Sequence, residues 1–92
     1  MKKRLQITFH GQVQGVGFRY TAYHAAQMYG LTGWVQNEYD GSVAAEVQGT
    51  QRDIDGWLLA LQNDHYIRIE WIDRKELPVE EEERSFHIRG YE

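Results

Sequence analysis

Apolar and polar residues alternate along five short stretches of the chain, which is the pattern of strands that bury one face. These stretches are residues 3–10, 32–38, 42–48, 67–71 and 86–88. In the first of them, Leu5, Ile7 and Phe9 share one face. The second and third flank Asp40-Gly41, a dipeptide that favours a tight hairpin turn between two strands. The pattern therefore predicts five strands, two of them joined as a hairpin.

Two further stretches carry apolar residues at the three- and four-residue spacing of an amphipathic helix. Those positions are Ala22, Ala25, Ala26 and Tyr29 in the first stretch, and Ile54, Trp57, Leu58 and Leu61 in the second. Gly30 follows the first stretch and is typical of the residue after a helix C-terminus. Thr50 precedes the second as an N-cap candidate, and Asp53 favours its first turn. We therefore expect two helices.

The order βαββαβ, with a split β-α-β unit repeated, predicts a ferredoxin-like α+β sandwich. We expect an antiparallel sheet of four to five strands with two helices on one face. The 92 residues contain no internal repeat and no linker, so we expect one domain over residues 1–92. A chain of this length buries a little over ~60% of its unfolded surface, so its stability will be modest.

The stretch between the first strand and the first helix, residues 11–19, combines three glycines with an arginine. Gly11, Gly15 and Gly17 allow a positive φ and a close approach to a ligand, and Arg19 offers a planar fork of donors that is always charged. Amides of such a loop can point inward, and the helix terminus adds positive potential. The stretch therefore predicts a cradle for a small tetrahedral anion; the alternative is a tight turn whose arginine lies in solvent.

Spacing excludes two nucleotide-binding motifs. A P-loop requires Gly-Lys-Ser/Thr after four intervening residues, but Val16 stands at that position and no lysine follows. A dinucleotide-binding loop requires a third glycine where this chain has Tyr20. These exclusions narrow the expected anion to a small phosphoryl group.

A second candidate residue is Asn37, at the end of the first hairpin strand. Its neutral amide can hold a water or a ligand oxygen, whereas an asparagine before a turn usually serves the turn itself. Taken alone, this segment leaves both interpretations open.

Together the two segments resemble the acylphosphatase family. The family's first signature, G-x-V-Q-G-V-x-F-R, is matched by residues 11–19, and its second, G-(aromatic)-V-x-N-x-x-x-G-x-V-x-x-x-x-x-G, by residues 33–49. Both match at every fixed position and in the right order. Residues 86–89 also resemble the family's last strand, and between residues 50 and 84 the resemblance is one of pattern.

The resemblance implies hydrolysis of small acyl phosphates, which are carboxylic-phosphoric anhydrides, to a carboxylate and inorganic phosphate. It implies Arg19 as the phosphate-binding residue and Asn37 as the residue that positions the attacking water. The expected phosphate-binding loop comprises Gln14, Gly15, Val16, Gly17, Phe18 and Arg19. Because an acyl phosphate already has a good leaving group, charge neutralisation and an aligned water suffice, and we expect no metal and no cofactor.

Two alternatives to a free-standing enzyme are open. One is a non-catalytic anion-binding or regulatory module of the same fold, but the presence of both Arg19 and Asn37 favours catalysis over binding alone. The other is the acylphosphatase-like domain of larger carbamoyl-transferring maturation proteins, which carry the same signatures. The chain ends soon after its last strand, which favours the free-standing enzyme.

Charge and composition limit the kinds of partner that we expect for this protein. The net charge is −4, divided into +1 over residues 1–46 and −5 over residues 47–92. This acidic balance argues against nucleic acid as a partner. Any anion site must depend on local positive groups, because the charge of the whole molecule repels anions. We expect a monomer that acts on a small-molecule acyl phosphate. The chain has no cysteine and no stretch of ~20 apolar residues, so we expect a cytoplasmic protein that does not bind membranes. Glu80–Glu83 is expected to be a solvated loop.

The histidines show no pattern of a metal site. His10, His24, His65 and His87 lack the three- or four-residue spacing of helical metal ligands. We expect them on the surface or on strand faces, with His10 as the candidate for acid-base chemistry because it borders the glycine loop. The aromatic residues expected in the core or at its rim, rather than on a base-stacking platform, are Trp34, Trp57 and Trp71.

Overall fold

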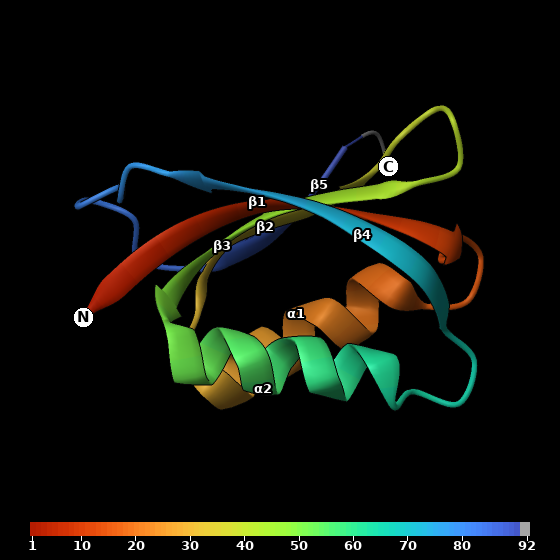
Figure 1. Cartoon of the computed structure of the whole chain (residues 1–92), viewed down its shortest axis with the longest axis horizontal. Helices are drawn as coiled ribbons and strands as arrows, with labels where there is room; N and C mark the ends of the chain where they lie inside the picture. Colours follow the sequence, from red (N-terminus) through yellow and green to blue (C-terminus); the bar gives the residue numbers. More distant parts are fainter. Residues whose placement is uncertain (91–92) are drawn as a thin grey trace.

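One five-stranded sheet forms one layer of the molecule, and two helices form the other (Figure 1). The computed structural model describes residues 1–90. Its elements are β1 (Lys2–Gln12), α1 (Phe18–Tyr29), β2 (Thr32–Asn37), β3 (Val43–Thr50), α2 (Gln51–Gln62), β4 (Arg68–Leu77) and β5 (Phe86–Arg89). The predicted ferredoxin-like α+β fold, with both helices on one face, is confirmed. Within the described range, neither helix is long and apolar enough to cross a membrane.

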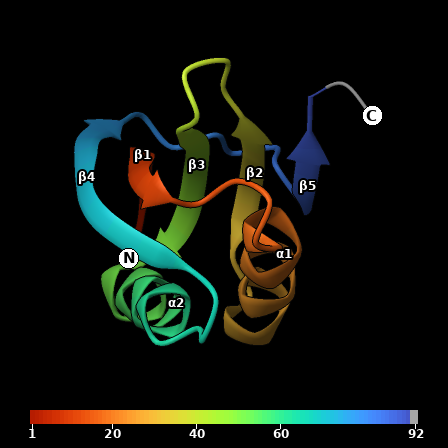
Figure 2. The same cartoon turned by 90° about the vertical axis from the view of Figure 1, so that its right-hand side faces the viewer.

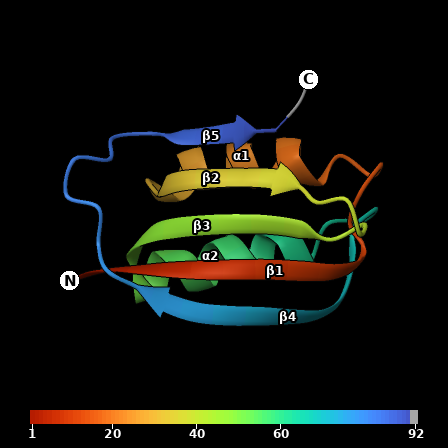
Figure 3. The ribbon, with the colours of Figure 1, turned by 90° about the horizontal axis from the view of Figure 1, so that it is seen from above.

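The strands of the sheet lie in the order β4-β1-β3-β2-β5 (Figure 3). β1 pairs antiparallel with both β3 and β4, and β2 pairs antiparallel with β3. β5 pairs parallel with β2, so this edge makes the sheet mixed rather than purely antiparallel. The chain leaves β4 at one edge and crosses to the opposite edge before it forms β5. This crossing places β5 beside the strand that ends in Asn37.

The core lies between the sheet and the helices, and Trp57 stands at its centre. Its indole is fully buried, and its Nε1–H donates a hydrogen bond to the backbone carbonyl of Ala22 at 2.9 Å, which joins α2 to α1. The ring also meets Phe9 of β1 and Phe86 of β5 edge-on, with ring centroids 5.9 and 6.1 Å away. One side chain thus connects both helices with two separate strands.

The caps and the hairpin turn follow the sequence expectations. Gly30 has a φ of 67° and its N–H donates to carbonyls of the last turn of α1. The Thr50 hydroxyl accepts a hydrogen bond from the Asp53 N–H at 3.1 Å, at the start of α2. In the hairpin, the N–H of Glu38 donates to the carbonyl of Ser42 at 2.9 Å. These predictions are confirmed.

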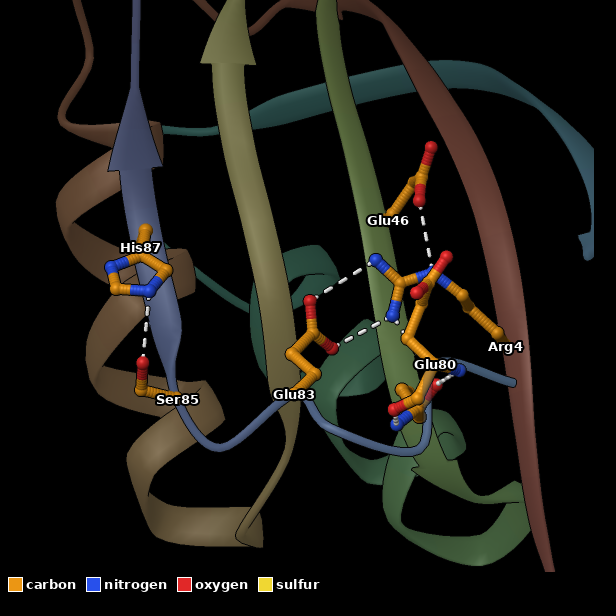
Figure 4. Close-up of polar contacts among 7 residues, drawn as sticks. Arg4, Glu46, Glu80, Glu83, Ser85 and His87 are labelled. Carbon is orange, nitrogen blue, oxygen red and sulfur yellow. Dashed lines mark hydrogen bonds and ion pairs between the residues drawn. The ribbon is translucent and has the colours of Figure 1, made fainter. Parts of the chain in front are cut away.

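The sheet face opposite the helices carries a buried cation, Arg4, which is 3% exposed (Figure 4). Its Nε donates to Glu46 Oε1 at 2.9 Å, and its Nη1 and Nη2 donate to the two carboxylate oxygens of Glu83 at 2.7 and 3.2 Å. The guanidinium thereby joins β1 both to β3 and to the segment between β4 and β5. Removal of one partner of an ion pair shielded from water is costly, because the other charge is then left without compensation.

The acidic stretch Glu80–Glu83 is therefore not the uniformly solvated loop that its charge predicts. Its two middle residues are exposed, but Glu83 is ion-paired with Arg4 and Glu80 is fixed through its backbone. Gln48 makes both of these backbone contacts: its Nε2 donates to the Glu80 carbonyl at 3.1 Å, and its Oε1 accepts from the Glu80 N–H at 2.8 Å. The segment is thus held against the sheet before it enters β5.

Stability should depend on the charge of Glu83. Burial alone raises the pKa of this carboxyl, but the hydrogen bonds and charge of Arg4 outweigh burial and hold the pKa below its ordinary value of 4.5. A carboxyl with a lower pKa in the folded state stabilises the fold above its unfolded-state pKa, and this contribution is lost as the pH falls through the folded-state pKa. Below pH 4.5 we therefore expect the urea midpoint of unfolding to fall more steeply for wild type than for Glu83→Gln.

Glu82→Gln changes an exposed carboxylate of the same segment, so it is the matched control and should keep the wild-type pH dependence. At neutral pH, Arg4→Met should lower the free energy of unfolding by about 3 kcal/mol, because it leaves partly buried carboxylates without a cation. Identical pH profiles for wild type and Glu83→Gln would mean that the ion pair does not stabilise the fold.

Candidate active site

The loop between β1 and α1 has a backbone conformation that alternates between positive and negative φ. Gly15 and Gly17 have φ angles of 75° and 77°. In the described chain only glycines have a positive φ, so Val16 between them has a negative one. Such alternation forms a nest in which successive N–H groups converge on an anion. A Cβ at either glycine would meet nothing within 4 Å. Backbone conformation, rather than space, therefore requires glycine at both positions.

Within residues 1–90, the first amides of α1 have no hydrogen-bond acceptor. The N–H of Thr21 donates to the carbonyl of Gly17 at 3.0 Å, so the N–H groups of Phe18, Arg19 and Tyr20 precede the helical ladder. In the described chain no side chain caps this helix, and its first turn contains no acidic residue. The helix dipole places positive potential at the same point. All these features favour a bound anion.

Arg19 and Asn37 face one cavity of about 540 Å³. Its lining consists of Val13, Gly15, Gly17, Phe18, Arg19, Tyr20, Asn37 and Ile88. Figure 2 shows how the loop after β1 passes the start of β3 and the end of β2 before it enters α1, so that the start of this helix lies near the end of β2. Between residues 1 and 90, no hydrogen bond or ion pair occupies the guanidinium of Arg19 or the carboxamide of Asn37. Both groups are available to a ligand.

Gln14 joins the glycine loop to the β2–β3 hairpin. Its Nε2 donates to the backbone carbonyl of Glu38 at 2.7 Å and to that of Ser42 at 2.9 Å. Since Glu38 directly follows Asn37, these bonds fix the loop relative to Asn37. The Gln14 side chain lines a neighbouring cavity of about 360 Å³, which Asn37 also borders. Gln14 therefore supports the predicted phosphate loop from outside the cavity that Arg19 and Asn37 line.

Two other residues of the predicted loop contribute their side chains to the core. Phe18 is 2% exposed, and its ring centroid lies 4.8 Å from that of Phe9. Val16 is partly buried and packs against the same core. These contacts fix the loop from the core side, while its backbone faces the cavity. The predicted site residues that the structure brings to one cavity are Gly15, Gly17, Phe18, Arg19 and Asn37.

Three residues of the cavity, Val13, Tyr20 and Ile88, are not among those predicted from the sequence. For Tyr20 a signal exists, because it directly follows Arg19. Alternation predicts Ile88 as a second core residue of the last strand, with Phe86, but Ile88 is 40% exposed. It reaches the cavity because β5 pairs with β2, and that pairing has no local sequence signal.

His10 lies outside this cavity. Its ring stacks on Trp71 with centroids 4.4 Å apart and an interplanar angle of 7°, and its Nε2 lies 3.0 Å from Asp73 Oδ2. Among the described residues, no three His, Cys, Asp or Glu side chains are placed to hold a metal ion. The geometry favours anion binding by backbone amides and Arg19 rather than by an imidazole.

Comparison with known proteins points to a single family. The acylphosphatase family model matches residues 5–88. The chain is similar to an acylphosphatase of Oceanobacillus iheyensis, at 36% identity over 95% of this chain and 98% of that protein, and to one of Clostridium acetobutylicum, at 37% identity over 96% and 98%. It is also similar to the crystal structure of acylphosphatase from Bacillus subtilis, with a TM-score of 0.87, 31% identity and coverage of 98% of this chain and 100% of that one. The crystal structure of T. kodakarensis HypF matches with a TM-score of 0.83 and 32% identity, over 97% of this chain but 12% of the other.

Loss of the Gln14 side chain should weaken anion binding. Gln14→Ala removes both hydrogen bonds to the hairpin, so the loop amides are no longer held in place before the anion arrives. At about 0.5–1.5 kcal/mol per bond, we expect inorganic phosphate to bind about tenfold more weakly, as measured by isothermal titration calorimetry. Gln12→Ala, at an exposed position at the end of β1, is the matched control and should bind phosphate as wild type does. Unchanged phosphate affinity in Gln14→Ala would contradict the supporting role.

Proposed function

The chain belongs to the acylphosphatase family and hydrolyses acyl phosphates to a carboxylate and inorganic phosphate, and we propose that Arg19 and Asn37 are its catalytic residues. Arg19 and the loop amides from Gly15 onward bind the phosphoryl group, while Asn37 positions the attacking water. One observation carries this assignment: a guanidinium, backbone amides and a carboxamide that have no partner among residues 1–90 line a single cavity. The relatives that match over nearly their whole length are named as enzymes, so they lend no support to a non-catalytic module.

The chemistry of the substrate explains why so few residues suffice. The leaving group of an acyl phosphate is a carboxylate, whose low pKa lets it depart without protonation. The remaining barrier lies in bringing water to a phosphorus atom surrounded by negatively charged oxygens. A site that neutralises this charge and holds the water in line therefore supplies what the reaction needs.

Arg19 binds the phosphoryl group from the start of α1. Its planar guanidinium matches two phosphoryl oxygens bidentately, and the unpaired N–H groups of the loop and of the first helical turn donate to the remaining oxygens. Since Gly15 and Gly17 hold the loop conformation before substrate binds, the donors need little reorganisation during the reaction. The charge on the transferring phosphoryl group is thereby stabilised.

Asn37 provides an oriented acceptor for the attacking water. Its carboxamide oxygen accepts a hydrogen bond from water but is not a base at neutral pH. Because no carboxylate or imidazole lines the described cavity, we assign the proton to the substrate itself. The water oxygen forms a bond to phosphorus, the bond between phosphorus and the acyl oxygen breaks, and its electron pair leaves with the carboxylate. The proton of the water passes to a phosphoryl oxygen.

We further propose that residues 1–92 form one domain that works as a cytoplasmic monomer on free small acyl phosphates. The net charge of −4 supports a small-molecule substrate over a nucleic acid, and a chain without cysteine fits a reducing compartment. Light scattering coupled to size-exclusion chromatography measures the oligomeric state directly.

The catalytic assignment predicts that hydrolysis fails when either side chain is removed. With benzoyl phosphate as substrate and EDTA present, we expect wild type to turn over, because Arg19 and the loop amides supply the positive charge. Arg19→Ala and Asn37→Ala should each lower kcat by about 10²-fold or more. The matched controls Arg52→Ala and Asn63→Ala change exposed residues of α2 and of its C-terminal end, and they should keep wild-type turnover.

Inhibition by inorganic phosphate separates the two roles. Arg19→Ala should weaken this inhibition, since the product occupies the phosphoryl site, whereas Asn37→Ala should largely preserve it. Turnover of Asn37→Ala at the wild-type rate would rule out the water-positioning role. Phosphate binding without turnover by the wild-type protein would instead support the non-catalytic module.

A further inference from the structure

The substrate cavity extends well beyond the space that a phosphoryl group fills. A water-sized group takes roughly 30 Å³, so the four oxygens around phosphorus, the one bridging to the acyl group included, occupy on the order of 120 Å³ of the 540 Å³ available. The remaining lining includes two large, exposed side chains, Tyr20 and Ile88. We propose that Tyr20 and Ile88 form the subsite for the acyl group and favour apolar, aryl acyl groups. This inference rests on the proposed function, which places the phosphoryl group at Arg19.

Ile88 reaches the cavity from β5. In the parallel pairing with β2 it lies opposite Val35, and Asn37 follows Val35 by two residues on the same face of β2. Phe86, two residues before Ile88 on the matching face of β5, is 2% exposed and meets Trp57, whereas Ile88 is 40% exposed. Ile88 therefore lies past the end of the core and adds apolar surface near the residue that positions water.

Tyr20 reaches the same cavity from α1. It directly follows Arg19 and is 67% exposed, so its ring is not part of the core. His24, one helical turn later, contacts this ring edge-on with centroids 4.2 Å apart, which restrains the ring on the helix surface. An aromatic side chain thus stands next to the arginine that binds phosphate.

The polarity of the lining decides which acyl groups fit. Arg19 is the only charged side chain that lines the cavity within the described residues, and the phosphoryl group engages it. Once Arg19 binds the phosphoryl group, a charged acyl group would lose water in this cavity without meeting an opposite charge. A flat apolar group instead gains contact with an aromatic ring and an aliphatic side chain. Benzoyl phosphate represents the favoured class, whereas the single methyl group of acetyl phosphate gains little.

The test measures kcat/KM for benzoyl phosphate and for acetyl phosphate in wild type, Ile88→Ala and Tyr20→Ala. In each variant we expect the benzoyl-to-acetyl ratio of kcat/KM to fall about threefold to tenfold, as partial loss of an apolar contact predicts. Tyr20→Phe keeps the ring and should keep the ratio. Leu59→Ala removes a side chain that is 56% exposed on α2, outside the cavity, and is the matched control whose two values should equal those of wild type.

An unchanged benzoyl-to-acetyl ratio in both Ile88→Ala and Tyr20→Ala would overturn the proposal, whether or not kcat/KM itself falls by the same factor for both substrates. Failure of the proposed function has a different signature, namely hydrolysis that survives Arg19→Ala. Binding of phenylphosphonate relative to methylphosphonate, measured by calorimetry, reports on the subsite without any turnover. It should show the same loss of preference in both variants, and an undiminished preference for phenylphosphonate would also overturn the proposal.

Discussion

The proposed anion site requires backbone N–H groups that the protein itself leaves without acceptors, and the two helices differ in this respect. The N-cap of α2 is Thr50, whose hydroxyl accepts from the N–H of Asp53, and the acidic side chain of Asp53 lies in the first turn of this helix. The N-cap of α1 is Gly17, and in the described chain this helix has neither a side-chain cap nor an acidic residue in its first turn. Because backbone donors must otherwise be paired or solvated, this difference leaves the start of α1 open to a ligand and supports the proposed anion site. The other parts of the site are positioned around these amides.

Unpaired amides bind an anion well only if the loop that carries them is held in place. Phe18 holds the loop from the core, and Gln14 holds it from the hairpin through two backbone carbonyls. One of these carbonyls belongs to Ser42, whose hydroxyl and N–H both donate to the carboxylate of Asp40. The same two hydrogen bonds hold the pKa of Asp40 below its ordinary value. A series of hydrogen bonds thus runs from the tip of the hairpin to the glycine loop, and Asn37 lies at the base of that hairpin.

Sequence patterns predict the features that depend on residues close together in the chain. They do not predict contacts between segments that are far apart in the sequence. Strands, helices and caps depend on a few adjacent positions, so alternation and cap residues are enough to predict them. Arg19 and Asn37 stand out because each lies in a motif of fixed spacing. Glu83, by contrast, looks like one of four equivalent carboxylates until the fold places Arg4 against it, and Ile88 looks like a core residue until β5 extends it past the core. Both depend on pairings across the sheet, which alternation within one strand does not encode.

The short strand β5 owes its position to contacts at both of its ends. Four residues of parallel pairing at a sheet edge provide few backbone hydrogen bonds, so pairing alone specifies the register weakly. Before the strand begins, Glu83 binds the buried Arg4 and ties the chain to β1 (Figure 4). At the end of the strand, the guanidinium of Arg89 lies 4.1 Å from the centre of the Trp34 ring on β2. Ile88 lies between these two contacts. An ion pair and a cation–π contact on the outer face of the sheet thus fix an apolar wall of the cavity on the other face.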